Sequence, residues 1–248
     1  MKRLWIEISF LYLISATLCL THQYNCDHGN ISCGCGLKNV DLRDDNDHPV
    51  EAIPYSWSMM VSIRYDCLGN GDSTTHCCVG TILNDRYILT TARCLKSRLL
   101  PGNITIAAGI HRLSQHSPSV RVVDQWFIHP NWTSNDAVIH DIALLRLAEP
   151  LNFHTDFIIR KTCFPFPMNT ALPMKNRTNL VAVGWSAWNQ SNDNINKVVQ
   201  QMNVHVMNSS DAFCARSVAN DQLFICTGRY ADQANVSSSS FRILFLIV

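Results

Sequence analysis

Short runs of apolar residues, many of them alternating with polar residues, follow one another from residue 51 onward. A period of two is typical of half-buried β-strands, and a long stretch with the 3.6-residue period of an amphipathic helix is missing. The runs are SWSMMVSIRY (56–65), CVGTILNDRYILTTA (78–92), NITIAAGIHRL (103–113), SVRVVDQWFIHP (119–130), DIALLRL (141–147), NLVAVGWSAW (179–188) and KVVQQMNVHVM (197–207). Turn sequences such as Leu-Gly-Asn-Gly and Pro-Gly-Asn separate them. The pattern predicts an all-β barrel or sandwich, with one short helix at 209–219.

The two ends of the chain do not share this pattern. Residues 1–20 (MKRLWIEISFLYLISATLCL) begin with two basic residues, continue with an apolar run and end near small residues, which is typical of a secretory signal peptide. An N-terminal anchor helix is the alternative, but Glu7 interrupts the apolar run. Residues 21–43 are rich in Cys and Gly and are interpreted as a pro-segment. The tail, 227–248, ends in an apolar run too short to span a bilayer. We therefore expect a secreted, extracellular protein without a membrane span in the mature chain.

The charge and the cysteines narrow the class further. The formal net charge of +1 over 248 residues does not favour a nucleic-acid partner. Removal of the signal peptide takes Cys19 from the eleven cysteines and leaves an even number, which predicts a disulfide framework in a secreted chain. Their spacings do not assemble a zinc-ligand quartet with histidine, so neither a metal nor another cofactor is expected.

Several N-x-[ST] sequences predict N-linked glycans on exposed loops of a secreted protein. They begin at Asn30, Asn103, Asn131, Asn176, Asn189, Asn208 and Asn235.

An ordered series of motifs resembles the trypsin/chymotrypsin-like serine peptidases over about residues 44–226. The motifs are EAIPYSW (51–57), CVGTILNDRYILTTARC (78–94), IHPNW (128–132), HDIALLRL (140–147), VGW (183–185) and FICTG (224–228). The resemblance implies a chymotrypsin-like fold of two antiparallel β-barrels, with the catalytic triad between them. Because the similarity ends near Cys226, we expect a complete first barrel and an incomplete second barrel.

The resemblance also assigns positions of the triad. Asp141 matches the aspartate, and Arg93 occupies the position of the histidine. An arginine guanidinium stays protonated, so it cannot take the proton of a serine hydroxyl. Arg93 either pairs with Asp141 or turns into solvent. The neighbouring His140 is not expected to replace the histidine, because adjacent side chains of a strand point to opposite faces.

The nucleophile and the activation switch also depart from the family. The family places its serine in a G-D-S-G-G motif downstream of the cysteine matched by Cys226, and the chain has no such motif, so no nucleophile is assigned. Arg43 matches the basic residue after which family zymogens are cut. The residues after Arg43, DDND, replace the apolar and glycine residues of the family, and a charged N-terminus is poorly suited to burial.

The resemblance implies some disulfide partners and leaves others open. It pairs Cys78 with Cys94, and Cys214 with Cys226. Cys163 matches the cysteine that tethers the pro-segment, so its partner is Cys35 or Cys33, and the remaining two of Cys26, Cys33 and Cys35 pair together. Cys67 and Cys77 flank a polar loop and can pair locally.

These observations predict a secreted, catalytically inactive homologue of the trypsin-like serine peptidases that acts by binding proteins or peptides. One alternative is a serine-type endopeptidase, of which this chain is an incomplete isoform or gene model. Another is a truncated product that misfolds. The Arg at position 93 and the absent serine motif weigh against the endopeptidase.

Overall fold

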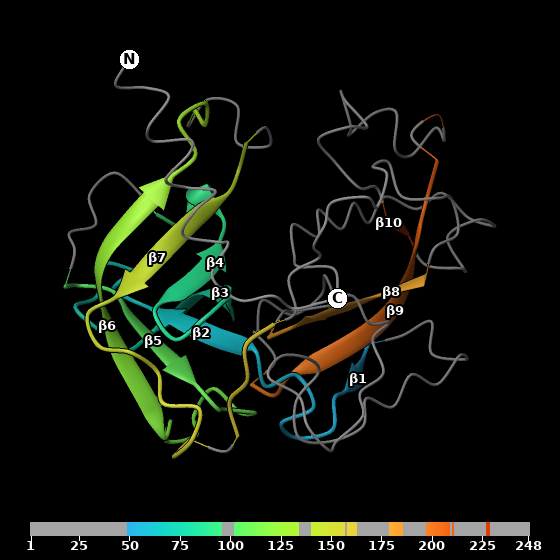
Figure 1. Ribbon diagram of the computed structural model, residues 1–248. Helices are drawn as coiled ribbons and strands as arrows, with labels where there is room; N and C mark the ends of the chain where they lie inside the picture. Colours follow the sequence, from blue (N-terminus) through green and yellow to red (C-terminus); the bar gives the residue numbers. More distant parts are fainter. Residues whose placement is uncertain are drawn as a thin grey trace.

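The computed structural model describes residues 49–95, 102–133, 140–156, 158–162, 179–185, 197–208, 210 and 227–228. The expected signal peptide and pro-segment, and nearly all of the expected short helix and tail, lie outside these ranges. The described elements are strands and one short 3-10 helix, and they form two neighbouring bodies (Figure 1). Among the described residues no helix is long and apolar enough to cross a membrane.

Six strands close the first barrel. They are β2 (Met60–Arg64), β3 (His76–Ile82), β4 (Tyr87–Thr90), β5 (Thr105–Ala108), β6 (Ser119–Ile128) and β7 (Ala143–Leu147). Their order around the barrel is β2-β3-β4-β7-β6-β5, and every pairing is antiparallel. The prediction of an all-β fold with a complete first barrel is therefore confirmed.

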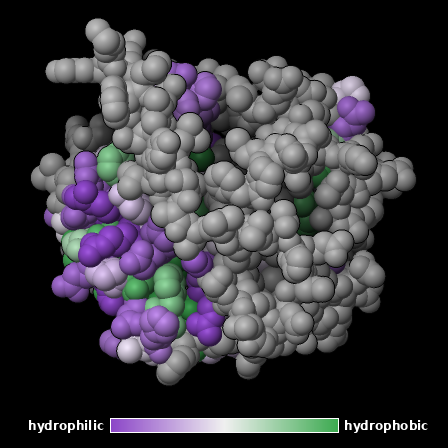
Figure 2. All heavy atoms as spheres, in the orientation of Figure 1, coloured by the Kyte–Doolittle hydropathy of each residue, from purple (hydrophilic) through white to green (hydrophobic). Residues whose placement is uncertain are grey.

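Alternation along the strands explains why this barrel forms. In β7, Ala143, Leu145 and Leu147 are buried while the residues between them are more exposed. These side chains join Ile63, Ile88 and other branched aliphatic residues in one apolar core. On the face seen in Figure 2, the described surface of the barrel is mostly hydrophilic, with scattered hydrophobic residues.

The second sheet is smaller in the described part of the chain. It consists of β1 (Val50–Glu51), β8 (Asn179–Gly184), β9 (Gln200–Val206) and β10 (Thr227–Gly228). β9 pairs with all three of the others, in antiparallel register. The sheet buries its own small apolar cluster and is not closed among the described residues.

β1 belongs to the second sheet, although it comes just before the strands of the first barrel in the chain. Its Val50 and Glu51 pair with β9 of the second sheet. Trp57 and Met60 then pack with Trp185 and Val199 in an apolar cluster between the bodies. The Trp57 indole also donates to Gln201 Oε1 over 2.9 Å. The start of the described chain therefore bridges both bodies.

Candidate functional site

Arg93 lies at the end of a buried strand of the first barrel. After β4 the chain passes Thr91 in an extended conformation and forms the 3-10 helix η1, Ala92–Cys94. A disulfide joins Cys94 to Cys78 of β3, and the Tyr65 hydroxyl donates to the Cys94 carbonyl over 2.9 Å. The disulfide implied by the resemblance is present and holds the backbone of Arg93 against the barrel.

Strand register brings Asp141 to the same place. Thr90, the last residue of β4, pairs with Ala143, the first residue of β7. Residues that follow β4 therefore meet residues that precede β7, and Asp141 lies beside Arg93. The Asp141 backbone is not in a strand.

Two donors of Arg93 bind the Asp141 carboxylate. The Arg93 backbone N–H donates to Oδ1 over 2.7 Å, and the side-chain Nε donates to Oδ2. The Asp141 side chain is fully buried, whereas 37% of the Arg93 side chain is exposed. Of the two arrangements that the sequence allowed, the structure shows the pair. It has the position of a histidine–aspartate pair, but the guanidinium that replaces the imidazole has no lone pair to take a proton from a hydroxyl.

His140 does not replace the missing histidine, but for a different reason from the one expected. It lies in a turn before β7 and not on a strand, with a left-handed φ of 59°. Its ring stacks on His129 with 4.5 Å between ring centroids. Burial, and then the charge of His140, lower the pKa of His129. The His140 imidazole therefore faces a second histidine.

A serine–histidine pair that was not predicted from the sequence lies elsewhere in the barrel. Ser62 Oγ and His76 Nδ1 are 2.8 Å apart, and Arg64 Nε donates to the same Ser62 oxygen over 3.3 Å. Burial, and then the nearby Arg64 charge, lower the pKa of His76 to about 4. The pair joins β2 to β3, and no motif marks it in the sequence.

This pair does not form a catalytic centre. Ser62 is fully buried, so a substrate carbonyl cannot reach its hydroxyl. An imidazole with a pKa of about 4 is a weak base at neutral pH. The His76 ring instead makes an edge contact with Trp185, with 5.5 Å between ring centroids. The pair therefore contributes to the contact between the two bodies.

The remaining site predictions divide by position. Cys67 and Cys77 form the local disulfide that the sequence left open. Asn103, Asn131 and Asn208 are exposed, which is what glycosylation requires. The other predicted positions lie outside the described residues, namely Arg43, Cys26, Cys33, Cys35, Cys163, Cys214, Cys226, Asn30, Asn176, Asn189 and Asn235.

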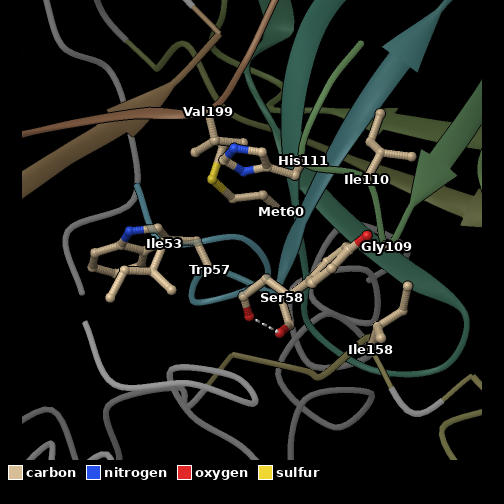
Figure 3. A pocket seen from close by; sticks show the side chains of 10 residues that line it. Ile53, Trp57, Ser58, Met60, Gly109, Ile110, His111, Ile158 and Val199 are labelled. Atoms are coloured by element: carbon tan, nitrogen blue, oxygen red, sulfur yellow. Dashed lines mark hydrogen bonds between the residues drawn. The ribbon is translucent and has the colours of Figure 1, made fainter. Parts of the chain in front are cut away.

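A small pocket lies where the two bodies meet (Figure 3). Ile53, Met60, Ile158 and Val199 give it an apolar lining, and His111 adds a ring that hydrogen-bonds to Glu51. Its volume of about 10 Å³ has room for about one water molecule. The pocket is too small for a substrate. Over the described ranges, no cluster of three or more His, Cys, Asp or Glu side chains is arranged to hold a metal ion.

Comparison with known proteins gives related serine peptidases. Over 162 residues, the chain is 26% identical to mouse (Mus musculus) Ovochymase-2, covering 62% of this chain and 25% of that protein. Over 149 residues, it is 28% identical to Chymotrypsin-like elastase family member 1 of Bos taurus, covering 59% of this chain and 52% of the elastase. The chain thus spans between a quarter and about half of the length of these relatives.

Solved structures share the fold. Human heparin binding protein superposes with a TM-score of 0.57 and 20% identity, covering 73% of this chain and 71% of that one. Neuropsin, a serine protease expressed in the limbic system of mouse brain, gives a TM-score of 0.58 and 21% identity, covering 73% of each chain. The family model for Trypsin matches residues 48–238. The chain belongs to the trypsin family of serine peptidase domains.

Proposed function

We propose that this chain is a secreted, non-catalytic member of the trypsin family that acts by binding proteins or peptides. The observation that carries the proposal is the bond between Arg93 and the Asp141 carboxylate. Triad chemistry needs a base beside the serine, and the aspartate must orient that base. Here the aspartate holds a guanidinium, which has no lone pair for a proton.

The size of the missing contribution favours inactivity over slow catalysis. Loss of the triad histidine in a serine protease costs about a million-fold in turnover, or roughly 8 kcal/mol of transition-state stabilisation. The loss of the histidine base carries this cost whichever serine attacks the substrate.

Covalent labelling of serine tests the proposal. A fluorophosphonate probe reacts with activated serines, so it would be applied to the purified chain before and after cleavage following Arg43. Active trypsin is the positive control, and heat-denatured chain controls for non-specific labelling. We expect no labelling above the denatured control and no peptide turnover. Labelling at a serine together with turnover would establish the endopeptidase instead.

Secretion and glycosylation form the second part of the proposal. The two disulfides of the first barrel and the exposed Asn103, Asn131 and Asn208 support an oxidising, extracellular location. Treatment of the expressed protein with an N-glycosidase should increase its gel mobility. An unchanged band, or retention in the cytosol with free thiols, would contradict this part.

A further inference from the structure

Two disulfides leave adjacent residues of β3 and lie in different surroundings. Cys78 pairs with Ile63 in the β2–β3 ladder. Its disulfide partner, Cys94, is only 5% exposed. Cys77 is bonded to Cys67 and falls at the register shift of the same ladder, where Ile63 pairs with Cys78 and Arg64 pairs with His76. Cys77 is therefore the extra residue of a β-bulge, outside the ladder.

The Cys67–Cys77 bond closes an exposed loop. Asp66 and residues 68–74 are exposed, and Leu68 at 72% is the most exposed large hydrophobic side chain of the described chain. The hydrogen bonds of the loop run mainly within it: Asp66 accepts from the backbone of Asn70 and Gly71, and Asp72 accepts from Thr74. Tyr65 N–H bonds the Thr75 carbonyl across the base of the loop over 3.3 Å. The disulfide is thus a covalent cross-link across the base of this loop.

We propose that Cys67–Cys77 is a site of thiol–disulfide exchange with a protein dithiol, and that its opening frees residues 66–76 while the barrel stays closed. Exchange requires access to a sulfur and a leaving thiolate that water can solvate. Cys67 and Cys77 are partly exposed at the base of a solvated loop. Cys78 is partly exposed as well, but attack on its sulfur would release a thiolate at the buried Cys94, where apolar surroundings disfavour the charge.

The exchange proceeds in two balanced steps. A thiolate of the dithiol attacks the sulfur of Cys67 or Cys77, the bond between them breaks, and the displaced cysteine thiolate takes a proton from water. The second thiol of the dithiol then displaces the remaining cysteine and forms a disulfide within the reductant. Cys67 and Cys77 gain two electrons and two protons, and the dithiol is oxidised.

Opening the bond also affects the contact between the two bodies. His76 is next to Cys77 in β3, bonds Ser62 and contacts Trp185 of the second body. Relaxation of the bulge would increase the solvent access of the His76 ring. The loop is therefore coupled to this junction, while Cys78–Cys94 keeps Arg93 in place. The inference does not depend on whether the chain turns over peptides.

Timed alkylation of the folded chain tests the proposal. Full-length protein is incubated with reduced thioredoxin or with dithiothreitol and quenched with iodoacetamide at intervals. The remaining disulfides are then reduced and labelled with a heavy reagent. Iodoacetamide thus marks the cysteines of opened disulfides, and fragment spectra of peptide 65–86 show which of Cys67, Cys77 and Cys78 carries it. We expect Cys67 and Cys77 to be labelled at least about tenfold faster than Cys94. Equal rates, or labelling of Cys67 and Cys77 only in denaturant, would overturn the proposal.

A double variant, Cys67→Ser with Cys77→Ser, tests the coupling to His76. It should retain the near-ultraviolet circular dichroism of the folded barrel while the imidazole signals of His76 shift in NMR spectra. Unchanged His76 signals would refute the coupling. If the variant does not fold, the barrel depends on this disulfide, and the claim that the barrel stays closed after reduction is wrong. The order of labelling in the wild-type chain decides the exchange itself in either case.

Discussion

The first barrel contains two polar pairs that differ in opposite respects from a catalytic centre. Arg93 and Asp141 lie where the family places its histidine and aspartate, but arginine cannot act as a base. Ser62 and His76 have the residue types of a nucleophile and a base, but the serine is fully buried and the pKa of the histidine is about 4. The first pair has the position of the triad but its arginine is not a base, and the second pair has a histidine but its serine is not accessible.

The two pairs also contribute to stability in different ways. Asp141 is a buried carboxylate that needs its donors from Arg93, so this pair depends on charge. His76 is held neutral by burial and by the nearby Arg64 charge, so the other pair depends on the absence of charge. The following predictions separate these contributions, from the largest expected effect to the smallest.

Acid should weaken the fold through His76. The pKa of His76 is about 4 in the folded chain, against an ordinary value of 6.5. The unfolded chain therefore binds a proton at higher pH than the folded chain, so the stability from neutral His76 is complete above pH 6.5. This stability is lost as the pH falls towards 4, and the loss is up to about 3 kcal/mol in the free energy of unfolding.

Urea denaturation between pH 4 and 7.5 measures this loss. His76→Gln should flatten the pH dependence, whereas His116→Gln, at an exposed position, should leave it unchanged. If wild type and His76→Gln have parallel profiles, the folded chain does not hold His76 neutral.

Asp141→Ala should destabilise the barrel at neutral pH. The substitution leaves the Arg93 backbone N–H and guanidinium without the carboxylate that they bind. Removal of one partner of a buried ion pair typically costs 3–5 kcal/mol, but the Arg93 side chain is 37% exposed and water can solvate part of its charge. We therefore expect a loss of about 2–3 kcal/mol.

The Arg146–Asp124 ion pair provides a matched control for this variant. Its arginine is about as exposed as Arg93, at 39%, but the Asp124 side chain is 36% exposed whereas that of Asp141 is fully buried. Asp124 accepts two bonds of 2.9 Å from Arg146. Asp124→Ala should change the urea midpoint much less than Asp141→Ala, because water replaces the lost bonds. Equal shifts for the two variants would show that burial does not strengthen the Arg93–Asp141 pair.

Ser62→Ala should cost about 1 kcal/mol, the usual net value of one hydrogen bond in a protein. The change removes the oxygen shared by His76 and Arg64 but leaves the His76 ring and the Arg64 side chain in place. Thermal denaturation at pH 7.5 measures the effect, with the exposed Ser114→Ala as control. A loss as large as that of Asp141→Ala would mean that Ser62 supports more than these two bonds.

The barrel was predictable from sequence because its strands carry a clear period of two and occur in a family order. Arg93 and Asp141 were predictable for the same reason, since each adjoins a strand with a strong motif. Ser62 and His76 were not, because their contact depends on the β2–β3 register, which shifts by one residue at Cys77. β1 was not predicted, because two residues are too few to show the alternation of a strand.

Arg93→His should have the smallest effect of these substitutions. The backbone N–H bond to Asp141 does not depend on the side chain, and the Nδ1–H of an imidazole can donate where Arg93 Nε donates now. We expect a change in the free energy of unfolding below about 1 kcal/mol. Arg93→Leu, which removes the side-chain donor, should cost more. The histidine variant should still fail to react with a fluorophosphonate, because a base without an accessible, oriented serine performs no acyl transfer. Serine labelling with peptide turnover in Arg93→His, but not in wild type, would show that position 93 alone separates this chain from an active peptidase.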